Sequence, residues 1–333
     1  MWLNIKRSAE VCDRFYASIE NSDLLDGRRN DKISVIFTKW RNIKTLTNAI
    51  HHYRFILEPV VCKLYISWNP SLGKPGIELT RLKFLKEGPP VEIVYHRYES
   101  TSNIWSPIAG LATKAVFLAD DEHLPDLEKM EIAFETWKNN PQSLVGFFAR
   151  YHTRQKLVDP FQADMSGMDP ALPSVNVTDV PILHQPVSVV DEHHLWIYNI
   201  TSARRPRPYS LLASQMLMIN TEYLFVYSCL LPERIHRHID EQGEDSADLA
   251  MNVMIAGMTG SRPVLVKSDF VDPESGRFVG ESWALNRGQI LKDLVRIFTG
   301  GTRDPLQYNS VSVAQFNKIP FKKRSVKQWN KYT

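Results

Sequence analysis

Three consecutive acidic residues are the strongest chemical feature of the chain. Asp120, Asp121 and Glu122 follow directly after residues 115–119, which form an apolar run of strand length. Adjacent carboxylates repel one another unless a cation or solvent separates them. Carboxylate oxygens suit Mg²⁺ or Mn²⁺, and either ion can also bridge the oxygens of a diphosphate. The triplet therefore indicates either a metal and diphosphate site or a solvated acidic loop.

Two charged residues in the second half could act on a substrate. Asp248 ends an acidic stretch, residues 244–248, at the start of a helix predicted over residues 245–256. Acids at a helix start serve as caps, so Asp248 is interpreted either as a cap or as a carboxylate that faces a reacting carbon. Arg287 lies at the start of a helix predicted over residues 286–298. A cation there opposes the macrodipole, so Arg287 needs an anionic partner, either a diphosphate or a nearby carboxylate.

The order of the predicted elements brings several of these residues to one edge of a sheet. Apolar runs alternate with segments of helical periodicity over the first half, which indicates a parallel sheet with helices on its faces. Ligands of such sheets bind beyond the carboxyl ends of the strands. Asp120 and Asp121 lie at such an end, and Arg41 follows the first strand, where it can meet a phosphate or a base. The predicted strands are residues 33–37, 63–68, 91–95, 115–119, 144–148 and 263–266, and further helices are predicted over residues 45–53, 125–138 and 232–240.

The length of 333 residues fits one large α/β domain with additions. Residues 1–30 are polar and are interpreted as an N-terminal arm before a domain over residues 31–310. Within that domain, residues 153–208 are rich in proline and polar residues, which predicts an insertion. Residues 311–333 are predicted to form a basic C-terminal tail.

Composition excludes several classes of protein. The net charge of +3 is too small to indicate a nucleic-acid polymer as partner. The three cysteines, Cys12, Cys62 and Cys229, have no metal-ligand spacing and do not indicate a disulfide framework. No apolar run is long enough for a signal peptide or a membrane span. Glycosylation sequons at Asn176 and Asn199 give slight support for a luminal location.

The order and spacing of these segments resemble the glycosyltransferase domain of exostosins and exostosin-like proteins, glycosyltransferase family 64. The resemblance covers roughly residues 33–309. It rests on Arg41 and the Trp-Asn pair at 68–69, the strand with its acids at 115–122, the segments 132–137 and 145–152, the Asp-Leu-Ala-Met-Asn helix at 248–252 and Arg287.

The resemblance implies a GT-A fold, a mixed but mostly parallel sheet with helices on both faces. It also implies a UDP-sugar donor, Mn²⁺ or Mg²⁺ as cofactor, and retaining transfer of a hexose or N-acetylhexosamine to a glycan or glycolipid. Location in the Golgi or endoplasmic reticulum lumen and pairing with another glycosyltransferase are further implications. The implied site residues are Asp120 and Glu122 at the metal, Arg41, Asn69, Asn103, Asp120 and Asp121 at the nucleotide, and Asp248 and Arg287 at the reacting centre.

The sequence also departs from the family pattern. The third acid is Glu122 where the family has Asp, and Ile104 replaces a basic residue beside Asn103. Ser246 and Ile290 stand where the family has two cysteines, so we expect folding without an internal disulfide. These changes keep open an alternative, a weakly catalytic nucleotide- or glycan-binding protein or a partner subunit of the same fold.

Overall fold

A large sheet of eight strands forms the centre of the computed structural model, which describes residues 12–13, 27–97, 99–156, 194–200, 208–243, 246–274 and 281–314. The strand order is β11-β10-β5-β9-β4-β1-β2-β3, and β9 alone runs antiparallel to its neighbours. The strands are β1 (Arg29–Phe37), β2 (Val61–Trp68), β3 (Val91–Tyr95), β4 (Thr113–Ala119), β5 (Val145–Gly146), β9 (Leu217–Asn220), β10 (Val264–Val266) and β11 (Ser312–Val313).

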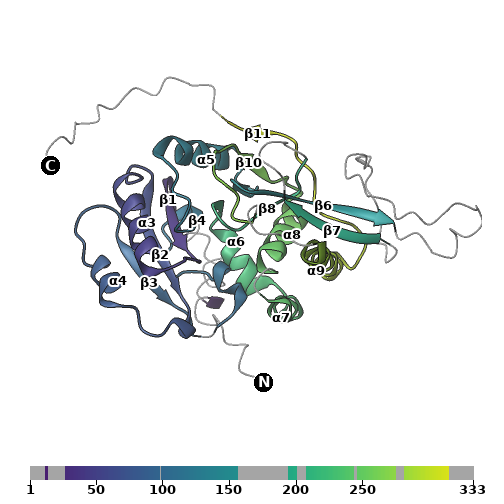
Figure 1. The fold of residues 1–333 in the computed structure, drawn as a ribbon, viewed down its shortest axis with the longest axis horizontal. Helices are drawn as coiled ribbons and strands as arrows, with labels where there is room; N and C mark the ends of the chain where they lie inside the picture. The colour runs from purple at the N-terminus through teal and green to yellow at the C-terminus, as the bar shows by residue number, and fades with distance from the viewer. Residues whose placement is uncertain are drawn as a thin grey trace, which may run out of the picture.

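Helices cover both faces of this sheet because its central strands are apolar on both sides. In β4, Phe117 packs into a core with α3 and α5, whereas Val116 and Leu118 pack into a second core with α8 and α9. Figure 1 shows the two groups of helices on either side of the strands. The predicted fold class is therefore confirmed. The helices are α3 (Ile43–Phe55), α4 (Ile77–Leu82), α5 (Leu127–Asn139), α6 (Glu222–Phe225), α7 (Glu233–Gln242), α8 (Ala247–Thr259) and α9 (Glu281–Thr299).

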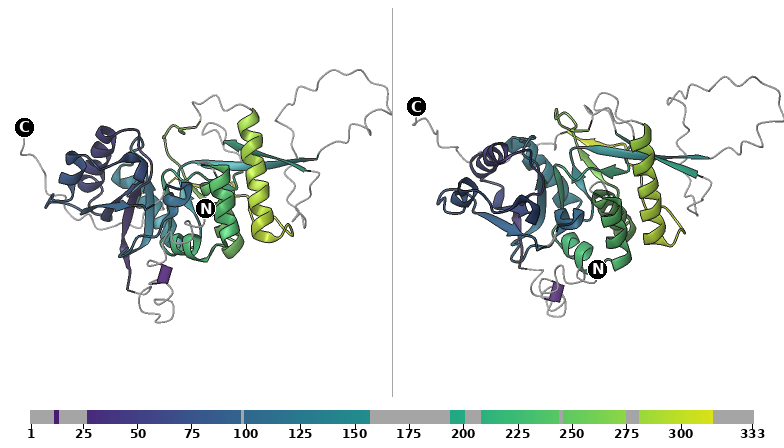
Figure 2. Two further views of the ribbon diagram at one scale, coloured as in Figure 1. Left: turned by 90° about the horizontal axis from the view of Figure 1, so that it is seen from below. Right: turned by 60° about the horizontal axis from the view of Figure 1, so that its bottom comes forward.

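A second, antiparallel sheet of three strands lies beside α9 (Figure 2). Its strands are β6 (Ala149–Lys156), β7 (His194–Ile200) and β8 (Leu211–Leu212), in the order β7-β6-β8. The strand predicted over residues 144–148 is therefore wrong in extent. The chain leaves the main sheet after Gly146, and the apolar residues that follow belong to the turn into β6.

Described strands lie within the predicted additions. The strand β6 continues into the predicted insertion and β7 emerges from it, so both flanks of that segment belong to the folded domain. The strand β11 lies within the predicted tail and pairs with β10. Most of the arm, the central part of the insertion with Asn176, and most of the tail lie outside the described residues. The described helices contain none that is both long and apolar enough to cross a bilayer.

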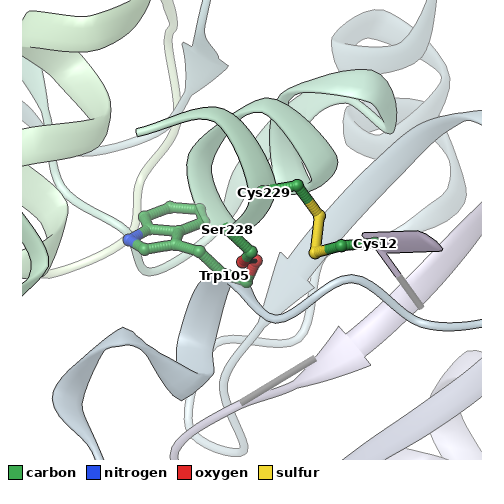
Figure 3. Close-up of a disulfide and its surroundings, with 4 residues drawn as sticks. All are labelled: Cys12, Trp105, Ser228 and Cys229. Carbon is green, nitrogen blue, oxygen red and sulfur yellow. Dashed lines mark hydrogen bonds between the residues drawn. A yellow bond between two sulfur atoms is a disulfide. The ribbon is translucent and has the colours of Figure 1, made fainter. Parts of the chain in front are cut away.

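A disulfide joins Cys12 to Cys229, so the expectation of no internal disulfide is wrong (Figure 3). No local pattern indicates this bond, because 217 residues separate its two cysteines. Cys229 lies in a short π-helix, Val226–Leu230, whose Ser228 hydroxyl donates a hydrogen bond to the carbonyl of Trp105. The bond attaches the N-terminal segment to this part of the core.

Replacing Cys229 with serine is expected to lower the free energy of unfolding. A cross-link between distant residues restricts the unfolded chain, and losing one typically costs about 2–4 kcal/mol. Thermal unfolding of Cys229→Ser and of Cys62→Ser measures the difference, since Cys62 is a free thiol. Equal melting temperatures for Cys229→Ser and the parent protein would show that the bond adds no stability.

Candidate active site

The acids after β4 are held in place by their own loop and by α3. Oδ1 of Asp120 accepts hydrogen bonds from the backbone N–H groups of Glu122 (3.0 Å) and His123 (2.7 Å). Oδ2 of Asp121 accepts from the backbone N–H of Arg41 at 2.8 Å and from the hydroxyl of Thr45. Asp120 and Asp121 are both buried. These two carboxylates therefore fix the loop at the carboxyl edge of the sheet and attach it to the start of α3.

Glu122 is the acid of the triplet that faces solvent. Its side chain is 37% exposed and pairs with the guanidinium of Arg41, which is 70% exposed. Among the described residues, no three His, Cys, Asp or Glu side chains converge into a complete metal site. A divalent cation bound through one carboxylate and the oxygens of a substrate diphosphate needs no such cluster. Glu122, an exposed carboxylate, can serve as the single protein ligand of such a cation.

His123 extends the acidic loop and was not identified from the sequence. Its Nδ1 lies 2.7 Å from Oδ2 of Asp120, and its Nε2 lies 2.9 Å from the carbonyl oxygen of Val271. Both partners are acceptors, so both ring nitrogens must donate, which requires the imidazolium form. Burial opposes that charge, but the hydrogen bond and the charge of Asp120 outweigh it and raise the pKa of His123. The sequence shows His123 three residues after Asp120, which could have indicated their contact, but nothing in the sequence indicates its contact with Val271.

Asn69 and Asn103 meet at the same edge of the sheet. The amide nitrogen of Asn103 donates to Oδ1 of Asn69 at 3.0 Å. Asn69 follows β2, and Asn103 lies in a short 3-10 helix, Thr101–Trp105, that follows β3. The indole ring of Trp68, the residue before Asn69, stacks on that of Trp40, with ring centroids 5.6 Å apart. The structure thus joins the two asparagines that were predicted to line one pocket.

Asp248 and Arg287 form a buried ion pair. Nη2 of Arg287 lies 3.0 Å from Oδ2 and 3.1 Å from Oδ1 of Asp248. Arg287 is 1% exposed. The prediction that Arg287 begins a helix is wrong, because α9 starts six residues earlier, at Glu281. Its anionic partner is the carboxylate of Asp248, in the first turn of α8, and Arg287 does not lie at the amino end of its own helix.

Asp248 is not the N-cap residue of α8. The cap position is Ser246, and Oδ1 of Asp248 accepts instead from the backbone N–H of Leu249 at 2.8 Å. The side chain of Asp248 is 14% exposed. Its carboxylate is therefore oriented by a backbone hydrogen bond and by Arg287 while it keeps some access to solvent. Residues 244–245 lie outside the described residues.

Two aromatic rings pack on Arg287, and the charge of a second buried arginine also acts on one of them. The guanidinium of Arg287 lies 4.4 Å from the ring centroid of Tyr198 and 5.3 Å from that of Trp283. Burial raises the pKa of Tyr198 to about 12, although the charges of Arg287 and Arg150 lower it. Arg150 is fully buried and pairs with Asp272 and Glu274. The sequence did not indicate that these residues lie near one another, because they come from four distant segments of the chain.

The segment 269–274 contacts both groups of candidate residues. At the acidic loop, the carbonyl of Val271 receives the hydrogen bond of His123. Beside Tyr198, Nη2 of Arg150 donates to Oδ1 of Asp272 at 2.9 Å. The ring of Phe270 packs on that of His123 at 5.6 Å. This segment therefore connects the acidic loop to the surroundings of the Asp248–Arg287 pair.

A Ser-His-Asp arrangement elsewhere in the domain is structural. Nδ1 of His152 lies 2.8 Å from the hydroxyl oxygen of Ser210, and Nε2 lies 2.9 Å from Oδ2 of Asp304. Burial alone would raise the pKa of Asp304, but His152 and Arg154 outweigh it and lower that pKa. Ser210 is 1% exposed and the imidazole stacks on Trp196. The hydroxyl cannot reach a substrate, so this network stabilises the junction of β6, β8 and the chain after α9.

Comparison with known proteins agrees with this architecture. Residues 33–163 and 183–317 match the family described as the glycosyl transferase family 64 domain, which is most of the chain. The match includes Asp120, Asp121, Glu122, Asp248 and Arg287.

Three relatives illustrate the similarity. "Glycosyltransferase family protein 64 C3" of Arabidopsis thaliana is 24% identical over 73% of this chain and 64% of its own length. "Glycosylinositol phosphorylceramide mannosyl transferase 1" of the same plant is 23% identical over 75% of this chain and 67% of its own length. Human "Exostosin-like 2" is 23% identical over 86% of this chain and 78% of its own length. The chain belongs to glycosyltransferase family 64, together with the exostosin-like proteins.

Proposed function

We propose that this protein is a retaining glycosyltransferase that moves a hexose or N-acetylhexosamine from a UDP-sugar to a glycan or glycolipid acceptor, with Mn²⁺ or Mg²⁺ as cofactor. The observation that carries the proposal is the buried pair of Asp248 and Arg287, 3.0 Å apart, in a domain of this family. A carboxylate and a guanidinium held together in a buried site can stabilise separated charge during transfer.

The nucleotide half of the proposed site lies at the ends of β1, β2 and β4. Asn69 and Asn103 present amide groups that can hydrogen-bond a uridine, and Arg41 presents an exposed cation to a phosphate. We propose Glu122 as the ligand of the divalent ion, which neutralises charge on the departing diphosphate when bound. Asp120 and Asp121 would act mainly by holding this loop, since their oxygens already accept hydrogen bonds from it and from α3.

The reacting half of the proposed site is the ion pair. Retaining transfer develops positive charge on the anomeric carbon and negative charge on the leaving phosphate. Asp248, whose side chain is 14% exposed, would face the first, and the buried Arg287 would orient that carboxylate and supply positive charge near the second, so both effects strengthen in the transition state. The rings of Tyr198 and Trp283 keep the guanidinium of Arg287 in place.

Mn²⁺ is expected to strengthen UDP binding by about tenfold, which corresponds to about 1.4 kcal/mol. Glu122→Gln should remove most of that difference. In the presence of a chelator, the variant should bind UDP at least as well as the parent, because Arg41 loses the carboxylate that competes with phosphate. Titration calorimetry with and without Mn²⁺ measures both effects. Glu128→Gln, an exposed acid in the first turn of α5, is the control, and equal UDP affinities with and without the ion would overturn the metal role.

A donor screen separates this proposal from its alternative. Free UDP released from each UDP-sugar in the presence of Mn²⁺ reports turnover. UDP binding without release from any donor would favour the weakly catalytic binding protein or partner subunit, which the Glu122 and Ile104 substitutions motivate.

A hexose as the transferred sugar and a glycolipid as the acceptor are supported by the relative named as a mannosyl transferase for glycosylinositol phosphorylceramide. The disulfide between Cys12 and Cys229 supports an oxidising compartment, as in the secretory pathway.

A further inference from the structure

Exposed apolar side chains concentrate at the end of the molecule that carries α4. The described chain exposes twelve large apolar side chains, and four of them lie between Leu72 and Leu85. Phe84 is the most exposed of the twelve, at 77%, and Ile77 is 68% exposed. Such a concentration on a surface marks a contact site more often than single exposed residues do. Figure 1 shows α4 at the opposite end of the molecule from α9.

The helical spacing of this segment directs these side chains outward together. The chain continues past α4 through hydrogen bonds from Phe84 N–H to Arg81 carbonyl and from Leu85 N–H to Leu82 carbonyl. Ile77, Arg81 and Phe84 are spaced by four and three residues, so they share one face. Leu79 and Leu82 are buried on the other face. The segment is therefore a short amphipathic element that buries one apolar face and presents a second to solvent.

A buried arginine holds the end of this element against α3. Nη1 of Arg54 donates to the carbonyl of Pro89 at 2.7 Å, and Nη2 donates to that of Leu85 at 3.5 Å. Arg54 is fully buried. At Gly88, where φ is +72°, a Cβ atom would lie 2.9 Å from the carbonyl oxygen of Arg54. The exposed segment is thus fixed to the domain, and Phe55 and Ile56, both more than half exposed, follow Arg54 directly.

Exposed cations alternate with the apolar side chains along this segment. Lys74, Arg81, Lys83 and Lys86 are all exposed, whereas the same stretch, residues 72–88, contains two carboxylates, Glu78 and Glu87. The ammonium group of Lys83 lies 5.5 Å from the ring centroid of Tyr95, which is 59% exposed. Long basic side chains beside exposed aromatic and aliphatic ones are typical of surfaces that enter the headgroup region of a bilayer. Basic residues near an anionic membrane add attraction that salt screens.

We propose that the surface formed by Ile77, Phe84 and Leu85, with Lys74, Arg81, Lys83 and Lys86, docks this domain onto a bilayer that carries anionic headgroups. The apolar side chains enter the interface and the cations contact the lipid phosphates. The excess of cations over carboxylates favours a lipid surface over a second copy of this chain, since two such surfaces would repel each other. The proposal does not depend on the catalytic assignments.

Co-sedimentation with vesicles tests the proposal. The protein is expected to sediment with phosphatidylcholine vesicles that contain phosphatidylserine, and much less with phosphatidylcholine alone. Phe84→Ser combined with Leu85→Ser should weaken binding about tenfold or more, because two apolar side chains no longer enter the interface. Lys83→Ser combined with Lys86→Ser should weaken it as well and should reduce its dependence on salt.

A control variant distinguishes this surface from a general effect of removing any exposed apolar side chain. Met258→Ser removes a side chain that is 55% exposed on α8, away from the proposed surface, and should leave vesicle binding unchanged. Thermal unfolding confirms that each variant is folded. No binding of the parent to anionic vesicles would overturn the proposal, and so would equal losses for Met258→Ser and the Phe84 and Leu85 variant. Sedimentation is also measured without vesicles. A dimer of the parent protein that is absent in the Phe84 and Leu85 variant would assign the surface to a second copy of the chain instead.

Discussion

Asp248→Asn is expected to lower turnover on the order of 10²-fold or more while leaving the affinity for the donor nearly unchanged. Asparagine keeps the size of the side chain and can still accept the hydrogen bond of Leu249. It loses the negative charge that would stabilise the anomeric carbon as the donor bond breaks. Interactions that strengthen only in the transition state lower the rate more than binding when they are removed. Steady-state kinetics measures turnover, and calorimetry with the UDP-sugar in the absence of acceptor, on the same preparation, measures the affinity for the donor.

The same substitution also affects stability, because Arg287 is 1% exposed and would lose its carboxylate partner. Removal of one member of a fully buried pair costs about 3–5 kcal/mol, and the partial exposure of Asp248 should reduce that cost. Stability therefore needs its own measurement. Asp293→Asn on the same helix as Arg287 is the control, since Asp293 accepts a hydrogen bond from Gln289 on the exposed surface. An Asp248→Asn protein that unfolds earlier but keeps its turnover would end the catalytic assignment.

Gly288→Ala is expected to destabilise the domain severely, by about 3 kcal/mol or more, as overpacking against a rigid neighbour can do. At Gly288, α9 approaches β7 so closely that an added Cβ would lie 2.0 Å from the carbonyl oxygen of Trp196 and 2.5 Å from its carbonyl carbon. The obstacle is backbone, which cannot rotate away as a flexible side chain can. The helix would have to move away from β7 and would displace Arg287, the preceding residue.

Gly257→Ala provides the matched control within α8. A Cβ at Gly257 would lie 3.9 Å from its nearest neighbour, Cβ of Pro305, which is an ordinary contact. Alanine is a better helix former than glycine by about 1 kcal/mol, so this variant should be as stable as the parent or more stable. Thermal unfolding of the two variants side by side makes the comparison. Similar melting temperatures for Gly288→Ala and Gly257→Ala would show that α9 and β7 are not in such close contact.

The sequence by itself determined the elements whose signal is local. The acidic triplet directly follows an apolar run, so its place at a strand end could be predicted from neighbouring residues alone. The helix α5 likewise follows from apolar periodicity within one segment. Order and spacing then indicated the family, and with it Asp248 and Arg287, although not that the two side chains touch.

Only the tertiary structure decided what distant segments do to one another. The strand predicted over residues 144–148 keeps only Val145–Gly146, because the chain turns out of the main sheet there and enters the second sheet at Ala149. Arg287 lies within α9 and not at its start, since helix propensity cannot locate an end without the packing around it. Cys12 pairs with Cys229 across 217 residues, and Gly288 fits against Trp196 from 92 positions away. A pattern of neighbouring residues reports local propensity and burial, whereas these contacts arise when the whole chain has folded and distant surfaces exclude solvent together.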